Sequence, residues 1–242
     1  MKKIIIIINI LSSINTLAND SLFLNANKDY ANEQYLAAIV KYDSIIINNL
    51  ESPELYYNLG NCYFKTNEIH QAIYYYEKTL KHNPSFNDAK ENLSLCKSKL
   101  IDKIDVMPEL FYKKLWGKIK NSISFNTWFI LTLISIWTML LFSTYSLFKS
   151  KNNIVEISLL SVALMLFIIT ISVNKDYLND RSAIIYATST DIMSAPSEKS
   201  TKLFTLHIGT KLKINDQIGD WVNINITNGG KGWVLITDIK EI

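Results

Sequence analysis

Cysteine and histidine are scarce in this chain of 242 residues, which contains two of the first and three of the second. The histidines, His70, His82 and His207, are isolated, and the chain has no H-E-x-x-H, G-x-S-x-G or phosphate-loop motif. Its acidic residues are spread along helix faces without a converging pair. The sequence therefore predicts no catalytic residues, no cofactor and no metal site, and we expect the protein not to be an enzyme.

A domain with a surplus of positive charge is also missing. Residues 19–124 carry 13 basic and 13 acidic side chains, and residues 174–242 carry 8 of each. The formal net charge of +3 therefore comes from Lys2, Lys3 and residues 149–156. A protein that binds nucleic acid needs a basic face that displaces counterions from phosphates. Nucleic acid is a poor candidate partner.

Charge is absent altogether from two long stretches. Residues 125–148 contain no charged side chain, and this length is sufficient to cross the hydrocarbon core of a bilayer as a helix. Ile157–Val173 is a second uncharged run, at the short end of the spanning range, for which a buried core helix is the alternative. The pattern predicts a transmembrane hairpin with helices at residues 125–148 and 157–174, joined by a loop at 149–156.

The amino terminus has a third apolar stretch with a different meaning. Lys2 and Lys3 precede a run from Ile4 to Leu17, and the segment ends in Thr16-Leu17-Ala18. A basic start, a short apolar core and small residues before a cut are typical of a secretory signal peptide. Residues 1–18 are therefore predicted to be a signal peptide, with an uncleaved anchor as the alternative.

An exported amino terminus predicts a bacterial inner-membrane protein whose soluble parts are periplasmic and whose loop at 149–156 is cytoplasmic. The positive-inside rule favours the opposite orientation, because four lysines precede the first span. They are Lys113, Lys114, Lys118 and Lys120. The signal peptide takes precedence, because it acts first during synthesis. The lysines belong to a connector, residues 101–124, whose apolar residues fall on one face and suit a helix lying at the lipid surface. A solvated connector is the alternative.

The segment from Tyr56 to Pro84, YYNLGNCYFKTNEIHQAIYYYEKTLKHNP, is similar to one tetratricopeptide repeat. Gly60 stands where the two helices of such a repeat approach most closely, and Pro84 ends the second helix. A shift back by 34 residues places Gly60 on Ala26, which predicts a second copy at residues 21–49. A shift forward gives a segment that soon turns polar, as a capping helix does. Residues 19–100 are therefore predicted to be an array of two repeats with a capping helix.

The two cysteines, Cys62 and Cys96, occupy equivalent positions of neighbouring repeats, where a small residue is usual. As buried packing residues they need no redox role. A disulfide is conceivable outside the cytoplasm. Equivalent positions in adjacent repeats lie about 10 Å apart, which is too far for the bond without distortion.

After Val173 the pattern changes from helical to alternating, with five of the seven glycines between Gly209 and Gly232. This indicates a small barrel of about five strands. Residues 182–242 also resemble the bacterial SH3-like (SH3b) family. The stretches that carry this resemblance are Ala195-Pro196-Ser197, Gly209-Thr210, Trp221 and Gly230-Lys231-Gly232-Trp233-Val234. Trp221 and Trp233 are candidate ligand contacts, although in so small a barrel such residues are more often core.

The chain is thus predicted to be multidomain, with all-α repeats, a transmembrane hairpin and an all-β SH3-like barrel. This order resembles BatE-type proteins of the bacterial Bat aerotolerance operon. The resemblance is carried by Tyr57-Asn58-Leu59-Gly60-Asn61, Asn126-Thr127-Trp128 and the stretch from Leu203 to Thr210. It implies a component of a cell-envelope complex with other Bat membrane proteins and a MoxR-type ATPase system, and so names a system rather than a reaction.

The resemblance to tetratricopeptide arrays implies a partner-binding groove on the concave side. The residues at groove-lining positions are Phe23, Asn27, Tyr30, Glu54, Tyr57, Asn61, Phe64 and Lys65. Asn27 and Asn61 share one repeat position, where an amide is able to pair with a peptide backbone. An aromatic groove suits an apolar or extended segment, whereas an inert spacer that uses the aromatics for packing is the alternative.

Two functional hypotheses follow. The favoured one is a non-catalytic, membrane-anchored scaffold that binds partner proteins in the cell envelope through its repeats. The competing one is a cell-wall protein whose SH3-like barrel grips peptidoglycan while the repeats are accessory. A surface groove beside Trp221 or Trp233 would be the structural sign of the second.

Overall fold

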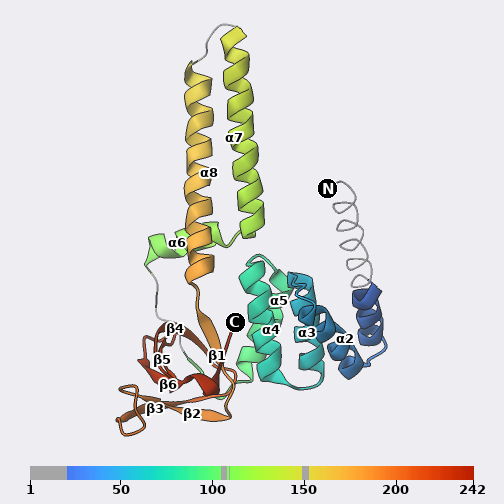
Figure 1. The fold of residues 1–242 in the computed structure, drawn as a ribbon, viewed down its shortest axis with the longest axis vertical. Coiled ribbons are helices and arrows are strands. Elements are labelled where there is room, and N and C mark those ends of the chain that lie inside the picture. Colours follow the sequence, from blue (N-terminus) through green and yellow to red (C-terminus); the bar gives the residue numbers. More distant parts are fainter. Residues whose placement is uncertain (1–20, 105–107, 109, 149–152) are drawn as a thin grey trace, which may run out of the picture.

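The computed structural model describes residues 21–104, 108, 110–148 and 153–242. The predicted signal peptide, residues 1–18, lies outside the described residues, as does the first half of the predicted loop, 149–152. Three parts follow one another along the chain: a helical repeat region, a pair of long helices and an antiparallel β domain (Figure 1).

The repeat region is built from helix pairs. Its helices are residues 21–31, α2 (Tyr35–Ile47), α3 (Pro53–Lys65), α4 (Ile69–His82) and α5 (Asn87–Ser98). Ser52 caps the start of α3, because its Oγ accepts a hydrogen bond from the backbone N–H of Leu55 at 3.1 Å. The turn within each pair contains a residue with positive φ, Glu33 at 62° and Asn67 at 65°. These two residues are one repeat apart, so the turn recurs with the sequence.

Gly60 lies at the close approach of α3 and α4. A Cβ atom added to it would lie 2.6 Å from Cε1 of Tyr76, well inside ordinary contact distance. The ring of Tyr76 is fully buried in the core that Leu59 and Ala72 share, so it has no room to withdraw. The prediction that a side chain at Gly60 would push the two helices apart is confirmed.

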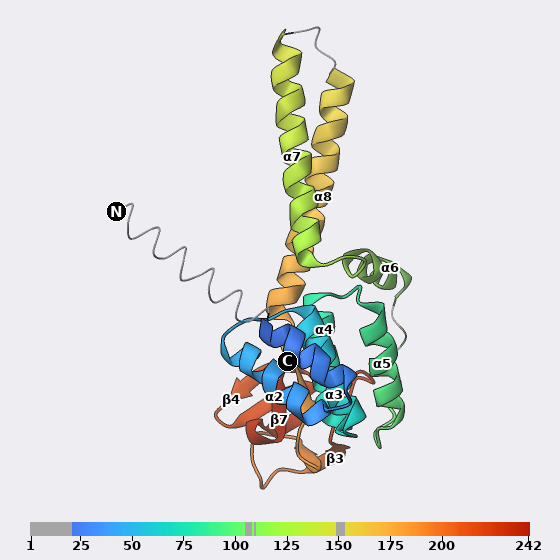
Figure 2. The ribbon, with the colours of Figure 1, turned by 90° about the vertical axis from the view of Figure 1, so that its right-hand side faces the viewer.

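The pair of long helices, α7 (Phe125–Phe148) and α8 (Asn153–Asn179), projects away from the rest of the molecule (Figures 1 and 2). Both are long and apolar enough to cross a membrane, and only 11% and 17% of their apolar windows are buried. A core helix of a soluble protein would instead be mostly buried. The helix α8 extends beyond the predicted span at both ends, since polar residues continue it.

Polar contacts join the two long helices to each other and to the helix before them. The hydroxyls of Thr132 and Thr170 form a hydrogen bond of 2.8 Å between α7 and α8. Helix α6 (Phe111–Lys120) lies crosswise at the ends of α7 and α8 that face the other two parts (Figure 1). The indole Nε1 of Trp128 donates to the backbone oxygen of Lys120 at 3.2 Å, which fixes the end of α6 beside α7.

The carboxy-terminal domain is one antiparallel sheet. Its strands are β1 (Ser182–Ile185), β2 (Ser189–Met193), β3 (Lys202–His207), β4 (Lys211–Ile218), β5 (Trp221–Asn225), β6 (Lys231–Leu235) and β7 (Ile239–Glu241), in the order β3-β2-β6-β5-β4-β1-β7. Residues 182–242 are described throughout, so the seven strands correct the predicted number of about five. The small β7 is too short to show an alternation in the sequence.

The inner face of the sheet encloses an aliphatic core. Residues that alternate along neighbouring strands meet there, including Ile192 of β2, Leu212 of β4, Ile224 of β5 and Val234 of β6. Ile104, which follows the repeats in the chain, packs against the same core. The segment that leaves the repeat region is therefore part of the β domain's packing.

The repeat region and the β domain lie at the same end of the long helices and contact each other (Figures 1 and 2). Ile184 of β1 is buried in the same apolar cluster as Ile73 and Tyr74 of α4, and Leu100 packs against this cluster. The two domains therefore share one core instead of being separated by a free linker.

Candidate functional site

The eight residues predicted to line the groove lie on two neighbouring helices. Phe23, Asn27 and Tyr30 belong to the helix at residues 21–31, and the other five belong to α3. Asn58 of α3 donates through Nδ2 to Oδ1 of Asn27 at 3.0 Å, which holds these two helices side by side. The structure thus brings both groups of predicted residues to one region of the repeats.

The two asparagines at the shared repeat position make the same internal contacts. Oδ1 of Asn27 accepts a hydrogen bond of 2.5 Å from the hydroxyl of Tyr42. One repeat later, Oδ1 of Asn61 accepts one of 2.7 Å from the hydroxyl of Tyr76, and a second of 3.0 Å from Nδ2 of Asn92. The side-chain oxygen of each asparagine therefore accepts a hydrogen bond from the hydroxyl of a buried tyrosine inside the array. Among the described residues, only the amide nitrogen of either asparagine is left to pair with a partner's backbone.

The predicted groove aromatics are half-buried. Tyr57 packs between Tyr76 and Phe86, with ring centroids 6.0 and 4.9 Å away. The ring of Phe64 is covered by the ammonium of Lys99, 4.6 Å from its centroid. These side chains pack against the repeat core on one side and reach solvent on the other. The arrangement leaves both the binding and the packing interpretation of the aromatics open.

Glu54 and Lys65, at opposite ends of α3, are exposed. Neither takes part in an ion pair among the described residues. Their opposite charges therefore flank the half-buried aromatics and amides of α3, an arrangement suited to an extended segment that carries polar groups at both ends. Neither side chain takes part in the amide–tyrosine hydrogen bonds of the repeats.

Trp221 and Trp233 do not belong to the core of the β domain. The alternation of β5 buries Val222 and Ile224, and that of β6 buries Val234, so both tryptophans project from the opposite face. Trp221 lies opposite Leu235, and Trp233 lies opposite Asn223. Both indoles are partly exposed, so the expectation that such residues are core does not hold here.

A buried carboxylate joins the repeats to the β domain, a feature that sequence reasoning missed. Glu77 of α4 accepts hydrogen bonds from Nζ of Lys97 in α5 at 2.7 Å and from Nζ of Lys211 in β4 at 2.8 Å. Burial alone would raise the pKa of Glu77, but the two ammonium groups outweigh it and hold this pKa below its ordinary value. Glu77 is therefore an ionised bridge between α4, α5 and the sheet.

A second bridge starts from the segment after α5. The carboxylate of Asp102 accepts hydrogen bonds from the backbone N–H of His207 at 2.6 Å and from the hydroxyl of Thr210 at 2.7 Å. It also lies 2.7 Å from Nδ1 of His207. Although burial opposes it, these hydrogen bonds hold the pKa of Asp102 below its ordinary value. His207, isolated in the sequence, is thus part of the contact between the domains.

Between these bridges the β3–β4 turn is fitted closely to the repeats. Gly209 has a φ of +89°, and a Cβ atom there would lie 2.6 Å from Cδ2 of Leu100. On the far side, the ammonium of Lys240 lies 4.2 Å from the ring centroid of Tyr74 and 4.7 Å from that of Tyr186. The contact therefore combines ionic, apolar and cation–π interactions.

The two cysteines are free and buried in the repeat core. Burial raises the pKa of the Cys62 thiol to about 12 and that of Cys96 to about 11. The disulfide considered for them does not form, and they act as small packing residues. Within the described residues, no group of three histidine, cysteine or acidic side chains is placed to hold a metal ion.

Comparison with known proteins identifies one part of the chain. The family model of the tetratricopeptide repeat matches residues 53–86, which contain α3 and α4. No curated protein matches the chain at a significant level. A crystal structure of an NlpC/P60 family protein from Bacillus cereus ATCC 10987 is similar over 28% of this chain and 22% of that one, with 20% identity and a TM-score of 0.23. This chain spans less than a quarter of that protein, and so low a TM-score carries no argument.

The matched repeat defines the class of the helical region. Tetratricopeptide repeats are protein-interaction modules and are typically non-catalytic. The repeat region therefore implies protein partners and a scaffolding role. The two long apolar helices and the antiparallel β domain are joined to this interaction module in a single chain.

Proposed function

We propose that this protein is a non-catalytic, membrane-anchored scaffold of the bacterial cell envelope. In this proposal, α7 and α8 cross the inner membrane and the repeats hold a partner protein close to its surface. The observation that supports it is that the β domain and the predicted groove use different parts of the repeat region. The described contacts between the β domain and the repeat region involve α4 and residues 100–104. They involve none of the eight predicted groove residues, which stay available to a partner.

The partner system follows from the resemblance of the chain to BatE-type proteins. We propose that the partners are other Bat-type membrane proteins and a MoxR-type ATPase system. The half-buried aromatics Tyr57 and Phe64, flanked by Glu54 and Lys65, suit an extended segment of such a partner. The β domain, as an SH3-like barrel, would then stabilise the repeats and add a second contact.

Orientation in the membrane is part of the proposal. The repeats and the β domain lie at the same end of the long helices (Figure 1), so both are on one side of the membrane whichever way the hairpin inserts. A working signal peptide at residues 1–18 places that side in the periplasm. Digestion by a protease added to spheroplasts tests this: both domains should be cleaved without lysis, and protection of both would reverse the orientation.

Co-purification tests the scaffold. The full chain, carrying an affinity tag, is isolated from gently solubilised membranes, and the proteins that elute with it are identified. A double charge reversal, Glu54→Arg with Lys65→Glu, should remove the partner, whereas the matched reversal Glu198→Arg with Lys199→Glu, in an exposed loop of the β domain, should not. Partners that persist in the α3 variant would place binding elsewhere.

A second function is favoured by one observation on the β domain. Trp221 and Trp233 present partly exposed indoles on the outer face of the sheet, and Oδ1 of Asn225 on that face is shielded but has no hydrogen-bond partner among the described residues. Such a face suits a saccharide or peptide of peptidoglycan. Pelleting of the purified full chain with peptidoglycan, lost in Trp221→Ala and in Trp233→Ala, would support this function.

A further inference from the structure

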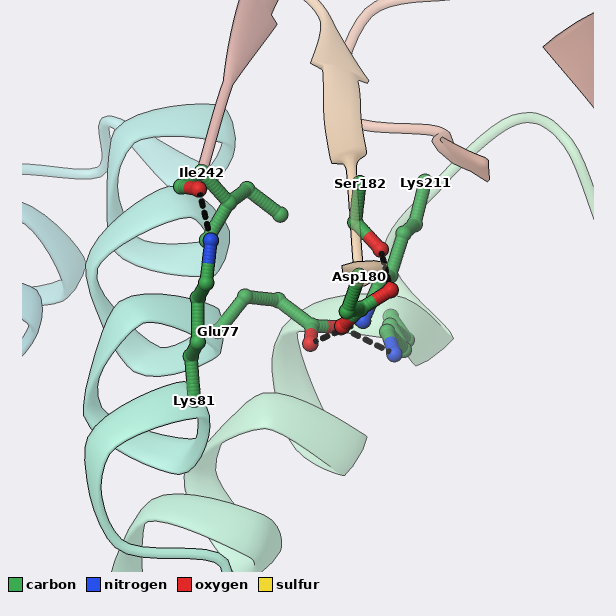
Figure 3. A network of polar contacts seen from close by, with 7 residues as sticks. Glu77, Lys81, Asp180, Ser182, Lys211 and Ile242 are labelled. Atoms are coloured by element: carbon green, nitrogen blue, oxygen red, sulfur yellow. Dashed lines mark hydrogen bonds and ion pairs between the residues drawn. The ribbon is translucent and has the colours of Figure 1, made fainter. Parts of the chain in front are cut away.

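A cavity of about 730 Å³ lies where the repeats, the β domain and the long helices meet. Its walls come from α4, α5, α6, the adjoining ends of α7 and α8, and β4. Figure 3 shows part of its polar wall, with Glu77 on α4 pointing toward Asp180, Ser182 and Lys211, and Lys81 reaching Ile242. No part of the predicted groove borders this cavity, so it is a separate site.

The cavity has an excess of positive charge. Five lysines line it, namely Lys81, Lys90, Lys120, Lys211 and Lys213, against three side-chain carboxylates. Two carboxylates are already neutralised, because Glu77 binds Lys211 and Asp176 pairs with Lys120. The third, Asp180, accepts a hydrogen bond of 2.8 Å from Ser182.

Two of these lysines are not balanced. Lys81 is already engaged, because it donates to the backbone oxygen of Ile242 at 2.6 Å and its charge acts on the carboxylate of Glu241. Lys90 and Lys213 form no ion pair within the described residues, and both are exposed. The cavity therefore holds cations that an anion from outside would satisfy.

Where the cavity adjoins the candidate membrane spans, apolar side chains line it beside the Lys120–Asp176 pair. Phe125 is the first residue of α7, Val173 ends the uncharged run of α8, and both line the cavity with Tyr177. Helix α6, with its exposed apolar side chains and its lysines, lies crosswise at the same level (Figure 1). The cavity thus combines lysines of the soluble domains with apolar side chains at the ends of the two long helices.

We propose that this cavity binds the head group of an anionic phospholipid. The phosphate is held near Lys90 and Lys213, and the glycerol and upper acyl chain lie against Phe125 and Val173. A free phosphate would use the lysines but leave the apolar side chains uncovered. The bound lipid fixes the repeats and the β domain against the membrane surface. This inference rests on the membrane anchoring proposed above.

Lipid binding by the full chain tests the inference. The protein is purified in detergent, stripped of lipid and mixed with 16:0/18:1 phosphatidylglycerol or phosphatidylcholine, and bound lipid is measured by native mass spectrometry. Wild type should retain phosphatidylglycerol in preference to phosphatidylcholine. The variant Lys90→Gln with Lys213→Gln should weaken phosphatidylglycerol binding about 25-fold, since each lysine near an anionic lipid contributes about fivefold.

A matched control is Lys199→Gln with Lys231→Gln, two exposed lysines of the β domain outside the cavity. It removes the same charge and should bind lipid as wild type does. Because all four lysines are exposed, the thermal midpoints should stay equal, which separates lost binding from lost folding. Equal loss in the control, or unchanged binding in the cavity variant, would overturn the inference.

Two further experiments are needed. The first distinguishes a lipid head group from free phosphate, and the second distinguishes failure of the lipid site from failure of the membrane anchoring. Inorganic phosphate at equal concentration should not displace the lipid; displacement would identify the site as one for free phosphate and overturn the lipid assignment. Extraction of membranes with alkaline carbonate reports anchoring independently. A chain released by carbonate would contradict the membrane scaffold itself, whereas a chain that stays in the membrane without lipid preference would contradict only the cavity assignment.

Discussion

The carboxylate of Glu77 on α4 binds the ammonium of Lys211 on β4 at 2.8 Å, across 134 residues of sequence (Figure 3). Glu77 is 6% exposed, and its other oxygen binds Lys97 of α5. The pair ties the repeat region to the β domain, because the buried charge is shared between a lysine of each. The two domains are therefore expected to unfold together.

The first prediction concerns this pair. Substitution Glu77→Gln removes a buried charge and leaves two ammonium groups facing a neutral amide. Loss of one partner of a buried pair costs about 3–5 kcal/mol. Lys97 and Lys211 are 44% and 35% exposed and regain water, so we expect a loss of about 1–3 kcal/mol. Thermal unfolding of the full chain in detergent measures it, with exposed Glu91→Gln as the control. Equal midpoints for Glu77→Gln and wild type would show that the domains are not coupled here.

The second prediction concerns Gly60. An alanine Cβ there meets the ring of Tyr76 at 2.6 Å, and overpacking of this kind costs about 1–3 kcal/mol. The gain in helix propensity, about 1 kcal/mol, offsets part of this loss. We expect Gly60→Ala to lower the thermal midpoint of the full chain. Gly117→Ala in α6 has no atom within 4 Å of the new Cβ and should not lower it. A stabilised Gly60→Ala variant would show that α3 and α4 separate without cost.

The third prediction is the acid response of the contact between the domains. The pKa values of Glu77 and Asp102 lie below their ordinary values of 4.5 and 3.8 in the folded chain. Groups with lowered pKa values stabilise the fold above their ordinary pKa, and this stabilisation is lost as pH falls through the folded value. Stability should therefore decline somewhat below about pH 6.5, because burial lowers the pKa values of His70 and His82, and fall further below about pH 4.5.

Thermal midpoints across this range check the acid response. Combining Glu77→Gln with Asp102→Asn should make the acid limb shallower, because two carboxylates that gain protons are gone. The exposed Asp191 and Glu241, whose pKa values are also lowered, keep a smaller acid limb. The control is again Glu91→Gln, which should keep the acid limb of wild type. A double variant with an unchanged acid limb would assign the loss to other carboxylates.

The fourth prediction concerns the thiols. Burial raises the pKa of Cys62 to about 12 and that of Cys96 to about 11, so almost no thiolate is present near neutral pH. A maleimide reagent should leave both cysteines of the native chain unlabelled and should label both after denaturation without reductant. Rapid native labelling would show that the repeat core opens readily. Labelling of neither after denaturation would indicate a disulfide.

Local periodicity was enough to predict the repeat region. Gly60 and Ala26, and Tyr76 and Tyr42, fall in phase because each is required at the same close approach. The amide–tyrosine network was also within reach, since Asn58 and Asn92 are related by the same shift as Asn27 and Asn61. What was unexpected is that Asn27 and Asn61 bind tyrosine hydroxyls within the repeats. The sequence pattern is the same whether an asparagine faces a partner or a tyrosine.

The contact between the domains could not be predicted in this way. Glu77 looks like any acidic residue of an exposed helix face, and its partner Lys211 belongs to a strand that is remote in sequence. Asp102 and His207 are single polar residues with no periodic signal. Long-range ion pairs depend on how two folded domains pack against each other. The periodicity of a single helix or strand carries no information about that packing. For the same reason, the cationic cavity was not visible in the overall charge balance of the two domains.

Site-specific photocrosslinking in intact membranes tests most directly whether the repeats hold a partner. A photoreactive amino acid is placed at Glu54 or Lys65 on α3, and at Glu198 or Lys199 in the exposed β2–β3 loop as controls. The scaffold account predicts one protein adduct shared by both α3 positions and absent from the controls. No adduct from α3, or an adduct only from the β domain, would contradict it.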